Sequence, residues 1–100
     1  MTALEELVAD SLVLWRIDAR FEGGRVLAPD GTEVRISAAD GPFRWSLAWR
    51  LPGETWDEAA RARFPRHYAS VAGLLKGLRM TLEPGWRPPR ARIAGQPLVG

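Results

Sequence analysis

The sequence predicts an α+β fold: an antiparallel sheet of three or four meander strands, covered on one face by a long C-terminal helix. Three observations lead to this prediction. Apolar and polar residues alternate in much of region 15–51, as they do in half-buried strands. Two short glycine-containing turns divide that region into hairpins. From residue 64 onward, apolar residues instead recur at spacings of three and four, which is typical of a helix.

Composition is consistent with one small domain. The chain has 100 residues, of which 46% are hydrophobic and 26% charged, an ordinary globular balance. It contains no cysteine, which excludes disulfides, thiolate metal sites and thiol nucleophiles. No apolar run approaches the length of a membrane span and the N-terminus is acidic, so we expect a cytoplasmic protein. Heavy use of Arg, Ala, Gly and Pro suggests a bacterial source.

A short N-terminal helix is expected over 3–10. Thr2 and Glu5 have the Thr-x-x-Glu spacing of a capping box, and Leu4, Leu7 and Val8 then share one helical face. Strict alternation over 15–22 favours a strand there rather than a longer helix.

The next two turns are expected to set the register of the sheet. A two-residue loop at Gly23-Gly24 would place Phe21 opposite Val26. A three-residue loop over 29–31, with glycine in the left-handed position, would place Val26 opposite Val34. Both registers bury the same face, and this agreement is the strongest evidence for the sheet.

The segment 43–51 is predicted to be the central strand, or the strand in contact with the covering helix. Every second residue is large and apolar, so one face of this strand carries Phe43, Trp45, Leu47, Trp49 and Leu51. Pro52-Gly53 would end it.

The cover is expected in two pieces. Thr55 and Glu58 form a second capping box, which starts a short helix ending near Arg63. Pro65 must kink or restart that helix, and a longer helix is predicted from Pro65 to Leu82. Its apolar stripe consists of Phe64, Tyr68, Val71, Leu75, Leu78 and Leu82. The domain would span 1–83, and 84–100 would be an extended Pro/Arg-rich basic tail.

Charge is unevenly distributed along the chain. Residues 1–60 hold 6 Arg against 11 Asp and Glu, and residues 61–100 hold 8 Lys and Arg against Glu83 alone. Such asymmetry is typical of a surface for acidic partners, although two oppositely charged halves of one domain can also attract each other. Because arginine suits phosphate and carboxylate recognition, the anion-binding candidates are Arg61, Arg63, Arg66, Arg87, Arg90 and Arg92.

The back of the long helix is predicted to carry small residues. Ala69, Gly73, Gly77 and Met80 lie opposite the apolar stripe, and glycine within a helix costs about 1 kcal/mol relative to alanine. Small residues permit close approach of another element. The N-terminal helix, the tail or a second subunit could fill this place, or the glycines could simply be exposed. Trp86 is the fifth partner-binding candidate, because it either pins the tail to the domain or anchors a partner.

No catalytic constellation is recognised. His67 and Ser70 would be close on one helix, but no third group orients them. No metal or cofactor motif is present, so neither is expected. We expect a small non-catalytic interaction domain, an adaptor or a homo-oligomer. The alternative is a binder of nucleic acid or anionic surfaces through the basic C-terminal part. The third is a small-ligand domain.

Overall fold

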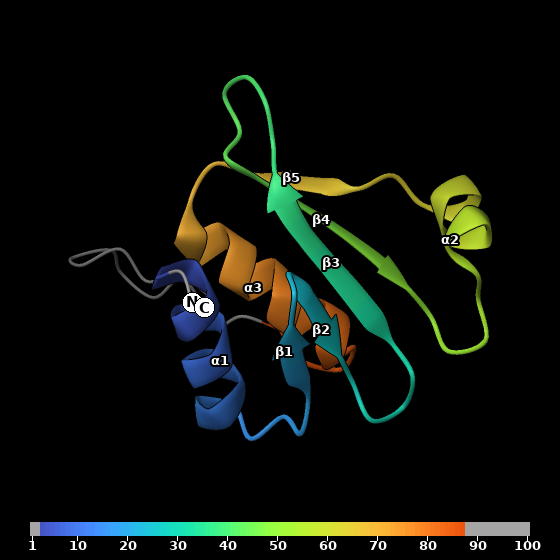
Figure 1. Ribbon diagram of the computed structural model, residues 1–100, viewed down its shortest axis with the longest axis horizontal. Helices are drawn as coiled ribbons and strands as arrows, with labels where there is room; N and C mark the ends of the chain where they lie inside the picture. Colours follow the sequence, from blue (N-terminus) through green and yellow to red (C-terminus); the bar gives the residue numbers. More distant parts are fainter. Residues whose placement is uncertain (1–2, 88–100) are drawn as a thin grey trace, which may run out of the picture.

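The structure of the chain, a computed structural model, describes residues 3–87. Along this part of the chain, a helix is followed by four strands, a second helix, a fifth strand and a third helix (Figure 1). In chain order they are α1 (Ala3–Leu14), β1 (Arg20–Glu22), β2 (Arg25–Leu27), β3 (Glu33–Ala38), β4 (Trp45–Arg50), α2 (Trp56–Ala62), β5 (Arg66–Tyr68) and α3 (Val71–Leu82). The predicted α+β class is therefore confirmed.

The strands form one antiparallel sheet in the order β1-β2-β3-β4-β5, which confirms the meander. Within the described residues the sheet has five strands, one more than the upper predicted number. Both predicted registers are correct: Phe21 pairs with Val26, and Val26 pairs with Val34. Gly23 and Gly24 have φ angles of 58° and 77°, as a tight hairpin loop of this kind requires.

One face of the sheet forms the core together with α1 and α3. These two helices lie on the same side of the strands (Figure 1). Full burial of an aliphatic side chain contributes roughly 1.5–3 kcal/mol before the entropy of the chain is subtracted. The buried cluster consists of Val8, Leu12, Val26, Val34, Leu47, Leu74 and Leu78.

The long helix predicted from Pro65 is wrong in its first part. Arg66–Tyr68 form β5, which pairs with β4, and α3 begins only at Val71. Ser70 is the N-cap residue, and its hydroxyl accepts a hydrogen bond of 3.1 Å from the Gly73 N–H. There is thus no kinked helix at Pro65: α2 ends before it, and a strand follows it.

The N-terminal helix is longer than predicted, and the first strand is shorter. α1 continues to Leu14 and ends in a Schellman motif, in which Ile17 N–H bonds to Leu12 C=O and Arg16 N–H bonds to Val13 C=O. Arg16 occupies the left-handed position, with a φ of 59°. The alternation over 15–19 was therefore misleading, although Trp15 still packs against the core.

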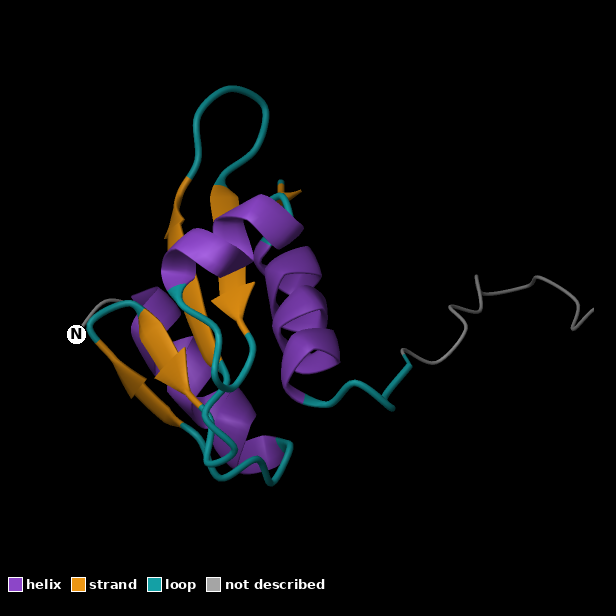
Figure 2. Ribbon diagram, turned by 90° about the vertical axis from the view of Figure 1, so that its right-hand side faces the viewer, coloured by secondary structure: helices purple, strands orange, loops and turns teal. Residues whose placement is uncertain are grey.

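Helix α2 lies on the other side of the sheet from α1. In Figure 2, α2 is in front of the strands and α1 behind them. Half of its predicted capping box forms, since Glu58 N–H donates to Thr55 Oγ1 at 3.1 Å. The Glu58 carboxylate accepts from the Thr55 hydroxyl, also at 3.1 Å, and not from the Thr55 backbone N–H. The guanidinium of Arg35, which points away from the core, lies 3.9 Å from the centroid of the Trp56 ring. None of the described helices is long and apolar enough to cross a membrane.

Candidate functional site

The place behind the glycines of α3 is filled by a side chain from the neighbouring strand. Gly77 is buried, and a Cβ atom at that position would overlap Oη and Cζ of Tyr68. A Cβ atom on Gly73 would lie 3.5 Å from Tyr68 Cδ1. The occupant is therefore the ring of Tyr68, which sequence analysis had placed on the opposite face of the same helix.

The other residues of that predicted set have different surroundings. Ala69 is exposed in the short connection between β5 and α3. Met80 is half-buried and lines a groove beside Trp49. Trp86 is half-buried against the guanidinium of Arg79, whose carbon lies 4.6 Å from the centroid of the Trp86 ring. This contact ties Trp86 to α3.

The predicted arginines have different roles. Arg61 is exposed on α2. Arg63, just after α2, donates hydrogen bonds to Glu54 and to the Trp49 carbonyl oxygen. Arg66, at the start of β5, is exposed. Arg87 donates to the carbonyl oxygens of Pro84 and Trp86. Arg90 and Arg92 lie outside the described residues.

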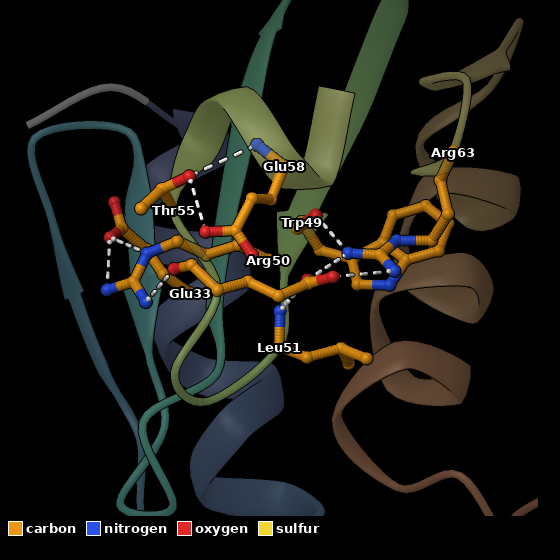
Figure 3. A network of polar contacts seen from close by, with 8 residues as sticks. Glu33, Trp49, Arg50, Leu51, Thr55, Glu58 and Arg63 are labelled. Carbon is orange, nitrogen blue, oxygen red and sulfur yellow. Dashed lines mark hydrogen bonds and ion pairs between the residues drawn. The ribbon is translucent and has the colours of Figure 1, made fainter. Parts of the chain in front are cut away.

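Arg63 covers the part of β4 that β5 leaves unpaired. β5 pairs with β4 only at residues 45–47, so Trp49 would present a free carbonyl group at the sheet edge. Arg63 Nη2 donates to that carbonyl oxygen at 3.3 Å and also pairs with Glu54 (Figure 3). The Leu51 N–H donates to Glu54 Oε1 at 2.7 Å. These side chains close the edge to another strand.

The pKa of Glu54 is lowered by this arrangement. The hydrogen bond from Arg63 has the largest effect, and the bond from the Leu51 N–H adds to it, because both stabilise the carboxylate form. Arg63 is therefore held by an ionised partner at neutral pH, and its guanidinium is engaged within the domain.

Arginines on the outer sheet face are also neutralised locally. Glu33 is buried and lies 3.2 Å from Arg50, 3.4 Å from Arg25 and 3.6 Å from Arg35. Figure 3 shows Arg50 next to Glu33. Burial of the carboxyl group acts to raise its pKa, but the Arg50 hydrogen bond and the three positive charges together lower it. The outer face thus offers less free positive charge than its arginine content suggests.

A groove remains in which arginines have no acidic partner. This Trp49 groove has a volume of about 410 Å³ and is lined by Trp49, Leu51, Arg66, Met80, Thr81, Pro84 and Arg87. Among the described residues, neither Arg66 nor Arg87 forms an ion pair. The guanidinium carbons of Arg66 and Arg63 lie 5.0 and 5.4 Å from the centroid of the Trp49 ring. We call the apolar side chains of Trp49, Leu51 and Met80 in this lining the apolar floor. Together with the two uncompensated cations, they can bind an anionic group that has an apolar neighbour.

Sequence analysis found Arg66, Arg87 and Met80 but missed Trp49 and Leu51. Both were assigned to the buried sheet face, yet Leu51 is 45% exposed and lies just beyond β4. Ser70 could have indicated them, because serine is a typical N-cap residue and predicts that the helix begins after residue 70. A strand before it would have brought Arg66 beside β4.

A second groove is apolar. It has a volume of about 530 Å³, lies between α1, β4 and the start of α3, and is lined by Ala3, Leu4, Leu7, Trp45 and Val71. Leu7 is 40% exposed beside it. The buried Nε1 of Trp45 has no hydrogen-bond partner among the described residues.

The residues that could act in catalysis or bind a metal ion are not grouped into a site within the described part of the chain. His67 lies in β5 with its ring 5.5 Å from that of Phe43, and Ser70 serves as the cap of α3, so the two are not on one helix as predicted. Within residues 3–87, no three His, Asp or Glu side chains are grouped closely enough to hold a metal ion.

Comparisons with protein-family models, curated proteins and solved structures find no match to this chain.

Proposed function

We propose that this chain is a small non-catalytic interaction domain that binds an anionic partner through the Trp49 groove. The observation that carries the proposal is the pair of uncompensated arginines, Arg66 and Arg87, at the margin of an apolar floor. Two acidic residues of this region are already engaged, because Glu54 pairs with Arg63 and Glu83 pairs with Arg79 at 3.2 Å. An anion from another molecule would supply the missing charge.

The test is binding of two simple polyanions, poly-L-glutamate and oligothymidylate, measured by fluorescence anisotropy at low and high salt. We expect at least one to bind the wild-type domain, and we expect the affinity to fall as salt is raised. The variant carrying Arg66→Gln and Arg87→Gln should bind about tenfold more weakly or worse, since hydrogen bonds to charged groups contribute about 1.5–3 kcal/mol.

The matched control is Arg61→Gln, because Arg61 is also exposed but lies on α2, outside the groove. It should retain the wild-type affinity. If neither polyanion binds at low salt, or if Arg61→Gln weakens binding as much as the groove variant does, the proposal is wrong.

Self-association is a second candidate function, and the apolar groove beside α1 favours it. Leu7 exposes 40% of its surface there, next to Leu4 and Trp45, and exposed apolar patches mark contact surfaces. Light scattering should then give a dimer for the wild type and a monomer for Leu7→Lys. Val13→Lys is the control, because Val13 is 78% exposed but does not line the groove. A wild-type monomer at high concentration excludes this candidate.

A further inference from the structure

The Trp49 groove combines two features that favour a particular class of anionic partner. Its floor is apolar, with contributions from Trp49, Leu51 and Met80, and its cations come from two separate elements. Arg66 begins β5, whereas Arg87 follows the end of α3. A ligand that uses the whole groove therefore needs an apolar group that covers the floor and more than one negative charge.

Two guanidinium groups lie close to the Trp49 ring. The carbons of both Arg63 and Arg66 lie over it, at 5.4 and 5.0 Å from the centroid. Single-stranded nucleic acids are bound by stacking their bases on free aromatic rings, with a basic track for the phosphates. In this groove two guanidinium groups already lie within cation–π range of the ring, and Arg63 is bound to Glu54 and to a backbone carbonyl group.

An arginine stacked on an aromatic ring keeps its in-plane N–H groups free for a carboxylate. Guanidinium and carboxylate match in geometry, and stacking holds the guanidinium in a defined orientation before the ligand arrives. The guanidinium carbon of Arg66 lies 5.0 Å from the centroid of the Trp49 ring, within the range of a cation–π contact, and Arg66 has no acidic partner among the described residues. Leu51 exposes 45% of its surface at the same place, where an aliphatic side chain could cover it.

Resting on the proposed function, we propose that the partner of the Trp49 groove is an acidic peptide segment in which an apolar side chain is flanked by carboxylates. The apolar side chain lies on Leu51 and Met80, one carboxylate meets Arg66, and the other meets Arg87. This one ligand neutralises the two arginines of the groove and covers its apolar floor.

The experiment uses three fluorescein-labelled peptides with Gly-Ser arms, whose centres are Glu-Leu-Glu, Gln-Leu-Gln and Glu-Ser-Glu. Anisotropy titrations with the full chain should show the tightest binding for Glu-Leu-Glu. We expect about tenfold weaker binding for the neutral peptide, which loses charge-assisted hydrogen bonds. Replacing leucine by serine removes the contact with the floor and should weaken binding by several-fold, about the effect of a lost apolar contact.

Variants of the domain then locate the binding. Arg66→Gln, Arg87→Gln and Met80→Gln should each weaken Glu-Leu-Glu binding, and Arg61→Gln should not. Circular dichroism of each variant shows whether it is folded. Since Arg66 and Arg87 are exposed, their replacement should leave the fold intact.

The same titrations with oligothymidylate separate this inference from the proposed function. If oligothymidylate binds tighter than Glu-Leu-Glu and depends on the same arginines, the groove binds anions but the acidic-peptide assignment is overturned. Equal binding of Glu-Leu-Glu and Glu-Ser-Glu also overturns it, because the floor then plays no part. If none of these ligands binds, the proposed function itself fails.

Discussion

The ring of Tyr68 lies directly against Gly77, at a distance that leaves no room for a Cβ atom on the helix. Tyr68 ends β5 and Gly77 is in the middle of α3, so this contact joins the edge strand to the helix that covers it. A glycine within a helix is normally unfavourable by about 1 kcal/mol relative to alanine. Here it makes the close packing of strand and helix possible.

We predict that Gly77→Ala destabilises the domain, although alanine is the better helix former. Overpacking costs about 1–3 kcal/mol, which exceeds the gain in helix propensity. The control is Gly73→Ala, whose Cβ atom would lie 3.2 Å from Ser70 Oγ and 3.5 Å from Tyr68 Cδ1 and would therefore fit with small adjustments. Urea denaturation should show a lower free energy of unfolding for Gly77→Ala only. Equal stabilisation of both variants would contradict the contact with Tyr68.

This contact also shows where sequence analysis succeeded and where it failed. The registers around Val26 were predictable because each hairpin turn is local and each fixes which side chains are buried. The segment 66–70 was assigned to a helix because Tyr68 fits the spacing of the apolar stripe. Its strand conformation depends on pairing with β4, which is distant in sequence and leaves no periodic signal in so short a segment.

Glu33 should make stability depend on pH. Its pKa is lower in the folded than in the unfolded chain, so its carboxylate contributes stability above the unfolded pKa of about 4.3, and this contribution is lost as the pH falls through the folded pKa. We predict that Glu33→Gln lowers the free energy of unfolding at neutral pH by about 1–3 kcal/mol, because three arginines lose their negatively charged partner.

The measurement is urea denaturation of wild type and Glu33→Gln at a series of pH values. The difference between them should shrink as the pH falls below the unfolded pKa of about 4.3, because the unfolded wild-type chain then binds a proton more readily than the folded chain does. Glu22→Gln is the control, because Glu22 is exposed at the end of β1. A difference that is constant from neutral to acid pH would show that Glu33 acts only through packing.

Arg63 should matter for stability rather than for binding. Arg63→Met keeps much of the side-chain volume but removes the ion pair with Glu54 and the donor to the Trp49 carbonyl oxygen, which leaves the edge of β4 unpaired. We predict a loss of about 1 kcal/mol in the free energy of unfolding for that hydrogen bond. Arg61→Met, at an exposed position on α2, should have no effect. Equal stability of the Arg63 variant and the wild type in urea would show that water replaces the guanidinium.

The composition of the Trp49 groove was only partly predictable, for a related reason. Sequence analysis selected Arg66 and Arg87 as cations, but it could not tell them from Arg63, which binds Glu54. All three are arginines near prolines, and only the path of the chain after α2 brings Arg63 to the edge of β4. Whether an arginine has an acidic partner depends on contacts made in the folded chain. Composition and residue spacing do not reveal these contacts.

Arg16 offers a way to stabilise the domain. It occupies the left-handed position at the end of α1, with a φ of 59°, where a side chain costs roughly 1–2 kcal/mol and glycine is preferred. We predict that Arg16→Gly raises the free energy of unfolding by about 0.5–1 kcal/mol, the remainder being offset by the greater entropy of glycine in the unfolded chain. Asp18→Gly, in the same connection but without a left-handed φ, should instead be destabilising. A lower melting temperature for Arg16→Gly would mean that the exposed arginine contributes a favourable interaction that outweighs its backbone strain.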